Sequence, residues 1–350
     1  MKTLAAVLNE INKPLTVEEL TIPQLRDGQV LVDVAYSGVC RTQLNEIRGA
    51  KGQDKYLPHT LGHEGAGVVQ EVAPGVDKLR PGDHVVLTWI KGCGADAPSS
   101  VYRRSSGSSV NSGAVSTLMT RAVVSENRLV KIPAAMPLRE ASLLGCAIPT
   151  GAGIVLNTAK VAAGSSVAVF GTGGIGLSAL LASRFAKATV IIAVDIYDHK
   201  LSQAMTVGAT HVINAGKQNV LSAILSATNG RGVDYAIESA GSAESMETAF
   251  QSVRDNGGLC ILAGNLPAGS RMSIDPFSLI RGKRIVGTWG GETQPDRDIP
   301  MYVEMFMSGD LDMQRLITHE YGLERINQAF DDLEQGRAGR VLVDMRADCT

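Results

Sequence analysis

Cys40, the adjacent pair His63 and Glu64, and Cys146 are side chains of the metal-binding type that lie far apart in the chain, each close to a glycine in sequence. Sulfur, imidazole and carboxylate donors are the ligands that zinc takes in proteins, and a catalytic zinc leaves one position open for substrate. Singly, each cysteine has a plainer interpretation as a small buried residue, and His63 as a hydrogen-bonded core histidine. The run Gly62-His63-Glu64-Gly65 and the two glycine-flanked cysteines together predict a catalytic zinc site.

A second motif predicts a dinucleotide site. Gly171, Gly173 and Gly176 form Gly-x-Gly-x-x-Gly after the apolar strand Val167–Phe170, and Asp195 follows nineteen positions after the last glycine. The glycines allow the tight turn, the approach of the pyrophosphate and close helix packing, and the helix N-terminus then faces the phosphates. The predicted turn comprises Gly171, Gly173, Gly174, Ile175 and Gly176.

The carboxylate of Asp195 decides which nucleotide the motif favours. This motif alone is weak evidence in a chain with 38 glycines, but Asp195 ends the next apolar strand, Ile191–Val194. At that place a carboxylate accepts hydrogen bonds from the ribose hydroxyls and repels a 2′-phosphate, so NAD is expected rather than NADP. The alternative for Asp195 is a helix N-cap or turn residue. A metal that polarises an alcohol, next to a nicotinamide site, indicates a dehydrogenase.

Composition excludes several other classes. The 350 residues carry a formal charge of -2 with 19% charged residues, which argues against a nucleic-acid or membrane surface. The uncharged stretch from Val161 to Ser183 is interrupted by the glycines of the motif, so a buried strand, turn and helix explain it better than a membrane span. Five cysteines without repeated spacing argue for a reducing, cytoplasmic location. The length predicts about two domains.

The pattern of the chain changes character twice. Residues 1–150 read as β-rich, with a first strand from Thr3 to Leu8 and turn signals such as Pro81-Gly82-Asp83. Residues 151–289 alternate short apolar strands with helical stretches, which predicts an α/β domain with a doubly wound parallel sheet. Residues 290–350 contain two amphipathic stretches and a closing strand, Arg340–Met345, which we expect to return to the first domain. The Ser/Gly-rich segment Ser99–Ser116 reads as a surface loop.

In order and spacing, these motifs resemble those of the zinc-containing medium-chain alcohol dehydrogenases, and the similarity covers essentially the whole chain. The resemblance implies a GroES-like catalytic domain, residues 1–150 plus 290–350, interrupted by a Rossmann NAD-binding domain, residues 151–289. It also implies a small-molecule alcohol or carbonyl substrate and a homodimer or homotetramer.

The resemblance assigns roles to individual residues. Cys40, His63 and Cys146 match the zinc ligands, with Glu64 a nearby carboxylate that is sometimes a ligand itself. Thr42 matches the hydroxyl that takes the substrate proton, and Thr150 the position beside the nicotinamide. The remaining matches are Arg41 and Arg340 for the pyrophosphate, Lys200 near the adenosine ribose, and Trp89 as an aromatic wall of the substrate pocket. From residue type alone, the arginines would be read as solvated charges and Trp89 as core.

This chain departs from the family pattern at several positions near the expected zinc sites. Cys93 stands alone where many members carry four cysteines for a structural zinc, and one cysteine cannot close a tetrahedral site, so one zinc per chain is expected. Gln43 stands where an acidic residue commonly orients the ligand histidine. Asn45 replaces a titratable histidine on the outer proton path. His59 and His84 have no evident task and are interpreted as structural.

Two alternatives remain beside a zinc- and NAD-dependent alcohol dehydrogenase. One is a zinc-independent reductase of the same superfamily that acts on quinones or enones with NADPH, but such members lack the cysteine pair and prefer a neutral or basic residue at Asp195. The other is a non-catalytic nucleotide-binding paralogue, since fold does not dictate function. The nature of the alcohol stays open. Arg103 and Arg104 are read as solvated charges more readily than as contacts to an anionic or sugar-like substrate.

Overall fold

The computed structural model describes residues 1–50, 52–267 and 269–347 of the chain. Contacts divide it into two compact units, which are described separately. Unit 1 contains residues 1–146, 294–308 and those from 317 onward, and unit 2 contains residues 147–293 and 309–316.

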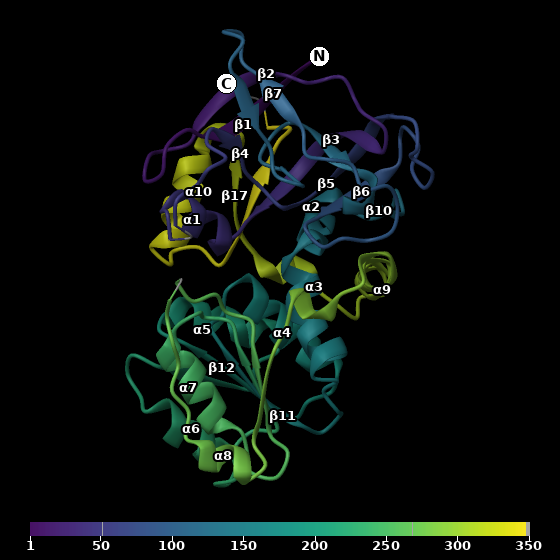
Figure 1. Ribbon diagram of the computed structural model, residues 1–350. Helices are drawn as coiled ribbons and strands as arrows, with labels where there is room; N and C mark the ends of the chain where they lie inside the picture. The colour runs from purple at the N-terminus through teal and green to yellow at the C-terminus, as the bar shows by residue number, and fades with distance from the viewer. Residues whose placement is uncertain (51, 268, 348–350) are drawn as a thin grey trace. The chain divides into compact units, whose positions relative to one another are not determined.

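Unit 1 is built from two β-sheets (Figure 1). Five strands close a small barrel in the order β1-β2-β7-β8-β4, and a seven-stranded sheet has the order β10-β6-β5-β3-β18-β17 with β9 paired to β3. The strands are β1 (Lys2–Leu8), β2 (Thr16–Thr21), β3 (Gln29–Val39), β4 (His59–Thr60), β5 (Glu64–Val72), β6 (His84–Thr88), β7 (Val101–Arg103), β8 (Ser109–Asn111), β9 (Arg121–Ser125), β10 (Leu129–Ile132), β17 (Ile317–Gly322) and β18 (Arg340–Asp344). The helices are α1 (Arg41–Ile47), α2 (Leu138–Ala141), α9 (Pro295–Met307) and α10 (Ile326–Glu334), with the 3₁₀ turns η1 (Glu126–Arg128), η2 (Ser142–Gly145) and η6 (Leu323–Arg325).

Strand β3 is the centre of the larger sheet. It pairs antiparallel with β5, β9 and β18 along different parts of its length. Residues on both of its faces are buried, and only Asp33 is partly exposed, which explains the near-continuous apolar sequence from Val30 to Ala35. The strand ends at Val39, so the next residue, Cys40, lies directly beyond the carboxyl end of this central strand. The expected first strand and the closing strand are both confirmed, as β1 and β18.

The segment 99–116 differs from the expected surface loop. It contains the hairpin β7–β8, whose registers pair Tyr102 with Val110 and which completes the barrel through β2 and β4. Tyr102 and Val110 are fully buried, and the Tyr102 hydroxyl accepts a hydrogen bond from the backbone N–H of Val123 at 2.8 Å. Two inward apolar side chains among serines and glycines were too weak a periodic signal to predict strands.

Arg104 anchors this hairpin to strand β2. Its Nε lies 2.6 Å from Oε2 of Glu18, and its guanidinium also donates to Asn9 at 2.5 Å. The hydrogen bond from Arg104 lowers the pKa of Glu18 to about 2. Arg104 is therefore a structural ion-pair partner, and Arg103 donates within its own hairpin to the carbonyl of Gly107 at 3.1 Å.

Unit 2 contains one six-stranded sheet in the order β13-β12-β11-β14-β15-β16, and every neighbouring pair is parallel. This is the doubly wound arrangement that the sequence predicts, and the strand order reverses between β11 and β14. The strands are β11 (Ser166–Phe170), β12 (Val190–Asp195), β13 (His211–Asn214), β14 (Tyr235–Glu238), β15 (Leu259–Leu262) and β16 (Arg284–Gly287). The helical elements are α3 (Ala147–Gly153), η3 (Ile154–Thr158), α4 (Gly174–Phe185), α5 (Asp198–Val207), α6 (Val220–Ala227), α7 (Ala243–Ser252), α8 (Pro276–Ile280), η4 (Gly290–Glu292) and η5 (Met313–Leu316).

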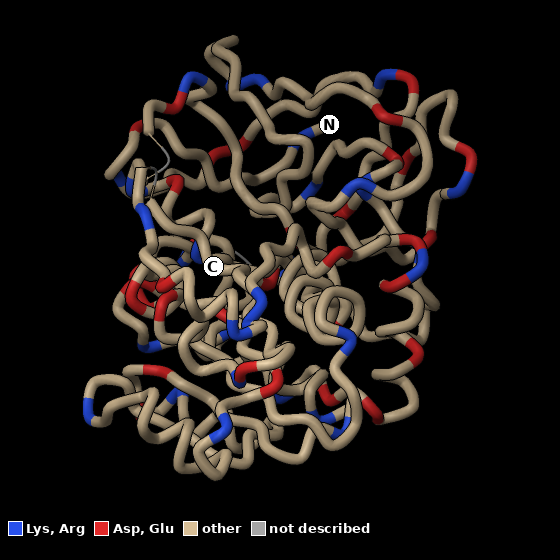
Figure 2. Tube along the Cα trace, turned by 60° about the horizontal axis from the view of Figure 1, so that its bottom comes forward, with Lys and Arg blue, Asp and Glu red and all other residues tan. Residues whose placement is uncertain are grey.

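Charge is dispersed along the chain. Lys and Arg alternate with Asp and Glu over the trace in Figure 2, and many of them form ion pairs with each other. Among the residues that the structure describes, no single helix is long and apolar enough to cross a membrane.

Candidate active site

Three of the sequence-predicted ligands meet within unit 1. The sulfur atoms of Cys40 and Cys146 and a ring nitrogen of His63 all lie within 4.8 Å of one another. Cys40 follows β3, His63 precedes β5, and Cys146 follows η2. Two thiol sulfurs and one imidazole nitrogen form a donor set of the catalytic zinc type, with a fourth position left for substrate. The residues therefore fit a zinc ion.

Glycines beside the ligands are required by close packing. Gly62 has φ +106°, and a Cβ there would overlap the side chain of Thr117 and lie 2.5 Å from the backbone nitrogens of Thr117 and Leu118. A Cβ on Gly145 would overlap the carbonyl of Leu87 and lie 2.7 Å from the Cα of Glu64. Only glycine lets these backbone segments approach so closely, and the approach brings His63 and Cys146 together.

The backbone of Cys40 is held by Gln43. Cys40 is the extended N-cap residue of α1, and its N–H donates to the side-chain oxygen of Gln43 at 2.8 Å. Gln43 is buried. It therefore fixes the start of α1 and, with it, the position of a ligand cysteine, rather than orienting the ligand histidine.

The three ligand side chains shift one another's pKa values. The hydrogen bond with Cys146 lowers the pKa of the Cys40 thiol well below its usual value, and the same contact raises the pKa of Cys146 well above it. Burial opposes the charging of His63, but the hydrogen bond with Cys40 and the negative charges of Cys40 and Glu64 together outweigh it and raise the pKa of His63. The thiolate is the form of cysteine that binds a metal, and a lowered pKa favours the thiolate. The arrangement therefore favours binding of a metal cation.

Glu64 and Arg340 form a buried ion pair in the same unit. Glu64 is fully buried, and only 4% of the Arg340 side chain is exposed. Gly38 makes room for the pair, because a Cβ there would meet the guanidinium of Arg340 and lie 2.7 Å from the Glu64 carboxylate. Glu64 is not in the group of clustered ligand atoms. Arg340, expected at the pyrophosphate, instead has its guanidinium on Glu64 and on the carbonyl of Val39 at 3.3 Å.

The predicted dinucleotide turn has the required backbone in unit 2. Gly171 has φ +83° after β11, and a Cβ on Gly176 would overlap the Gly171 carbonyl. Both positions need glycine for conformation or packing. A Cβ on Gly173 would instead meet no protein atom within 4 Å. Open space at the N-terminus of the twelve-residue helix α4 suits a phosphate group that approaches the backbone.

Asp195 ends β12 and contacts the same turn. Its Oδ2 accepts hydrogen bonds from the backbone N–H and the hydroxyl of Thr172, both at 2.8 Å, and its Oδ1 accepts from the N–H of Ile196 at 2.8 Å. The aspartate is thus bound to the middle residue of Gly-x-Gly, a role for Thr172 that the sequence motif does not specify. Lys200 follows five residues later, in the first turn of α5, with its ammonium 5.0 Å from the ring centroid of Tyr197.

The other predicted residues have varied surroundings. Arg41 is exposed at the start of α1, and Thr42 is half-buried next to it. Thr150 is buried in α3, and its hydroxyl has no hydrogen-bond partner among the described residues. Trp89 is half-buried directly after β6, and its carbonyl accepts a hydrogen bond from Arg128.

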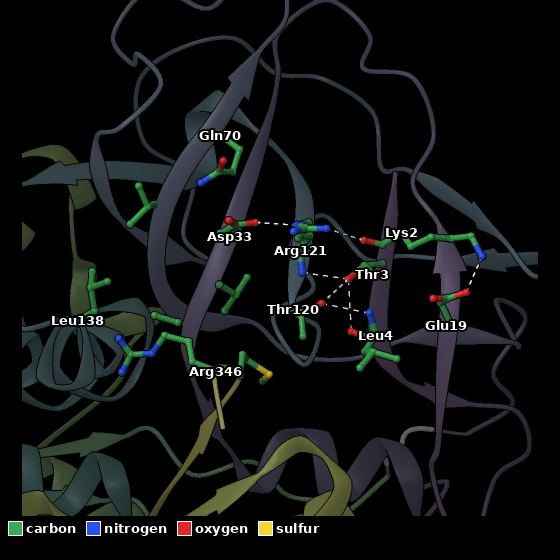
Figure 3. Close-up of a pocket in the computed structure, with 14 residues that line it drawn as sticks. Lys2, Thr3, Leu4, Glu19, Asp33, Gln70, Thr120, Arg121, Leu138 and Arg346 are labelled. Atoms are coloured by element: carbon green, nitrogen blue, oxygen red, sulfur yellow. Dashed lines mark hydrogen bonds and ion pairs between the residues drawn. The ribbon is translucent and has the colours of Figure 1, made fainter. Parts of the chain in front are cut away.

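A separate cavity of about 640 Å³ lies in unit 1 between strands β1, β3 and β9 (Figure 3). None of the three ligand side chains lines it. Its charged groups are all in ion pairs, Arg121 with Asp33 at 2.9 Å, Lys2 with Glu19, and Arg346 with Asp344, which lies outside the lining. We therefore assign no chemistry to this cavity.

Sequence reasoning missed one further cluster. Glu46, Asp54 and His59 bring two carboxylate oxygens and a ring nitrogen within 4.8 Å of one another. His59 was interpreted as structural, and no local motif links it to Glu46, thirteen residues earlier in the sequence.

Comparisons with known proteins agree with this geometry. Residues 26–134 match the family model described as alcohol dehydrogenase GroES-like domain, and residues 174–308 match the one described as zinc-binding dehydrogenase. The chain is 33% identical to S-(hydroxymethyl)glutathione dehydrogenase of Paracoccus denitrificans, over 98% of this chain and 100% of that protein. The corresponding protein of Synechocystis is 35% identical over the same shares.

Solved structures support the same relationship. A zinc-binding-domain alcohol dehydrogenase protein from Burkholderia ambifaria superposes with a TM-score of 0.91 at 36% identity, over 98% of this chain and 99% of that one. Benzyl alcohol dehydrogenase of Acinetobacter calcoaceticus superposes with a TM-score of 0.90 at 32% identity, over the same shares. The chain belongs to the zinc-containing medium-chain alcohol dehydrogenase family, and it is an oxidoreductase of the zinc type.

Proposed function

We propose that this protein is an NAD-dependent dehydrogenase that transfers a hydride between an alcohol and the nicotinamide, with one catalytic zinc per chain. The observation that carries the proposal is the convergence of the Cys40 and Cys146 sulfurs and a His63 nitrogen within 4.8 Å. When bound, zinc supplies Lewis acidity that favours loss of the alcohol proton, and NAD accepts the hydride. The zinc-independent reductase and the non-catalytic paralogue have no use for this donor set.

The residues of the chain divide the work. Cys40, His63 and Cys146 hold the metal, and Glu64 with Arg340 supplies fixed charge beside them. Thr42 needs only its hydroxyl to accept the substrate proton and pass its own outward. Trp89 is proposed as a wall of the substrate pocket.

The nucleotide contacts are proposed residue by residue. In unit 2, the backbone of Gly171–Gly176 receives the pyrophosphate and Thr150 lies at the nicotinamide, for which its unpartnered buried hydroxyl is suited. Asp195 and Lys200 bind the adenosine ribose. Arg41, which is exposed at the start of α1, and Arg340 are proposed for the pyrophosphate from the family resemblance. NAD is proposed over NADP because the Asp195 carboxylate would repel a 2′-phosphate.

The protein is further proposed to form homodimers or tetramers through the edge of the unit 2 sheet, and to work in the cytoplasm. Strand β16 is the last strand of that sheet. Large apolar side chains are exposed on it and nearby, namely Phe277, Ile280, Val286 and Trp289. An open strand edge flanked by exposed apolar residues suits pairing with a second copy.

The test is reduction of NAD and NADP followed at 340 nm with a panel of alcohols, before and after zinc chelation. The panel contains primary, benzylic, polyol and sugar alcohols together with S-(hydroxymethyl)glutathione, which is suggested by the names of the relatives. Chelator-sensitive activity with NAD supports the proposal and identifies the substrate class. Activity that needs NADPH and an enone, and that ignores chelation, would contradict it.

A further inference from the structure

A buried histidine and two carboxylates, one of them from helix α1, form a cluster in unit 1. His59 belongs to β4, and its Nε2 is 2.8 Å from Oδ2 of Asp54 and 3.7 Å from Oε1 of Glu46. Only 8% of the His59 side chain is exposed, against 13% for Asp54 and 28% for Glu46. Glu46 is therefore the member of the cluster with the most access to solvent.

Both ring nitrogens of His59 face acceptors. Nδ1 lies 3.0 Å from the carbonyl oxygen of Thr60, and Nε2 faces the Asp54 carboxylate. The Thr60 carbonyl and the Asp54 carboxylate therefore hold the ring from both sides and fix its orientation. The second carboxylate, Glu46, lies 3.7 Å from the same Nε2 and is more exposed than Asp54.

Helix α1 connects this cluster to the proposed chemistry. It begins directly after the ligand Cys40, and it contains both Thr42 and Glu46. Residues at positions i and i+4 of a helix lie on one face, with Cβ atoms about 5–6 Å apart. Glu46 is therefore the next titratable side chain outward from Thr42 along the helix. Asn45, which stands where the family pattern has a histidine, has no titratable group.

We propose that Glu46 is the outer proton carrier of this enzyme, and that the His59–Asp54 ion pair positions it. This inference rests on the proposed dehydrogenase function. During alcohol oxidation the O–H bond of the alcohol breaks and its proton goes to the Thr42 hydroxyl. Thr42 gives its own proton, directly or through a water, to the Glu46 carboxylate. Glu46 then releases the proton to solvent and becomes ionised again, and carbonyl reduction runs the same transfers backwards.

The charges around the carrier come from three segments. Among the described contacts, His59 from β4 faces Glu46 from α1 and Asp54 from the loop before β4. Asp54 is itself held by the N–H of Tyr56, which donates to Oδ1 at 2.8 Å. Loss of His59 should therefore remove one ion-pair partner of the Glu46 carboxylate, whereas loss of Glu46 leaves the His59–Asp54 pair in place.

The experiment measures kcat for alcohol oxidation with NAD between pH 6 and 10 in the zinc-loaded full chain. Glu46→Gln should lower kcat at neutral pH by roughly tenfold, less than the ~10²–10⁴-fold of a group that moves the proton at the reacting atom. The deficit should shrink as pH rises, because hydroxide can take the proton from Thr42, and added imidazole should restore the rate in proportion to its concentration. Glu46→Asp should recover part of the loss. Zinc content and NAD affinity should match the parent protein.

The matched control is Glu71→Gln, which removes an exposed carboxylate from β5 of the same unit and should leave the pH profile unchanged. A Glu46→Gln variant with the parent pH profile, or with a loss that neither pH nor imidazole relieves, overturns the relay while the dehydrogenase stands. A parent protein without chelator-sensitive activity overturns both. Two metal ions per chain, reduced to one by His59→Gln, would show that the cluster is a metal site and would also overturn the relay.

Discussion

Arg340 and Glu64 form an ion pair that is almost completely shielded from solvent, beside the converging side chains of Cys40 and Cys146. Burial alone would lower the pKa of Arg340, but the attraction of Glu64 and Cys40 outweighs it and raises that pKa. The cation thus compensates the carboxylate and stabilises the anionic form of a ligand cysteine. It links the last strand of the chain to β5 through charge as well as through the sheet.

Replacing Arg340 with Ala should destabilise the protein strongly, because it leaves the Glu64 carboxylate buried without its cation. The expected loss in the free energy of unfolding is about 3–5 kcal/mol, measured by urea denaturation. Arg121→Ala is the matched control, since its pair with Asp33 is about 40% exposed on both sides and should cost less than about 1 kcal/mol. Equal losses for the two variants would mean that burial of the Glu64 pair is unimportant.

Replacing Cys40 or Cys146 with Ser should remove zinc and turnover while leaving the fold intact, because each deletes one of three converging donors. Zinc content by elemental analysis, activity and circular dichroism give the three readouts. Cys93 is exposed and outside the ligand group, so Cys93→Ser should retain both metal and activity. Normal zinc content in Cys40→Ser would contradict the assignment.

Replacing Asp195 with Ser should change the nucleotide preference. The variant loses the acceptor for the ribose hydroxyls and the charge that repels a 2′-phosphate, so kcat/KM with NAD should fall by about tenfold or more and the ratio of NADP to NAD should rise. Thr172 loses its partner in the same variant. Thr172→Val, which removes only that hydroxyl contact, should change the ratio much less. An unaltered ratio in Asp195→Ser would speak against ribose recognition by this residue.

The Arg104–Glu18 pair should make stability depend on acid. The folded-state pKa of Glu18 is lowered from 4.5 to about 2, so the contribution of the carboxylate is fully present above pH 4.5 and is lost as the pH falls toward 2. Glu18→Gln should therefore unfold more easily than the parent at pH 7, by about 1 kcal/mol. The difference in stability between this variant and the parent protein should disappear as the pH falls from 4.5 toward 2, which thermal melts at pH 7, 4 and 2.5 would show. A gap that is constant with pH would exclude this origin.

Charge at the open edge of the unit 2 sheet should prevent self-association. Val286→Lys together with Ile280→Glu places charges on β16 and on α8, where apolar side chains are exposed. If the edge pairs with a second copy, sedimentation velocity should show a smaller assembly than for the parent. Phe185→Glu, an exposed apolar residue at the end of α4, is the control and should leave the assembly unchanged. The same mass for all three proteins would place any interface elsewhere.

Local sequence patterns predicted much of the architecture. The apolar strands of unit 2 were recognisable because each is a short buried run between helical stretches, and the parallel sheet follows from that alternation. Glycines in the dinucleotide turn were equally readable, because Gly171 needs a positive φ and Gly176 a close backbone approach. The hairpin β7–β8 was not predicted, because only two of its side chains point into the core.

The sequence by itself determined which chemical groups are present: two cysteines and a histidine that can bind a metal, and a glycine-rich turn followed by an aspartate. Residue type and local spacing are enough to recognise each of them. Only the tertiary structure decided which side chains meet. It brought Cys40, His63 and Cys146 together. It also paired Glu64 with Arg340, 276 positions apart in the sequence, and placed His59 beside Glu46 and Asp54. Such pairings form only when strands and helices that are distant in the sequence pack together. Burial and charge compensation act on these side chains only in the folded protein, so no local pattern specifies the pairings.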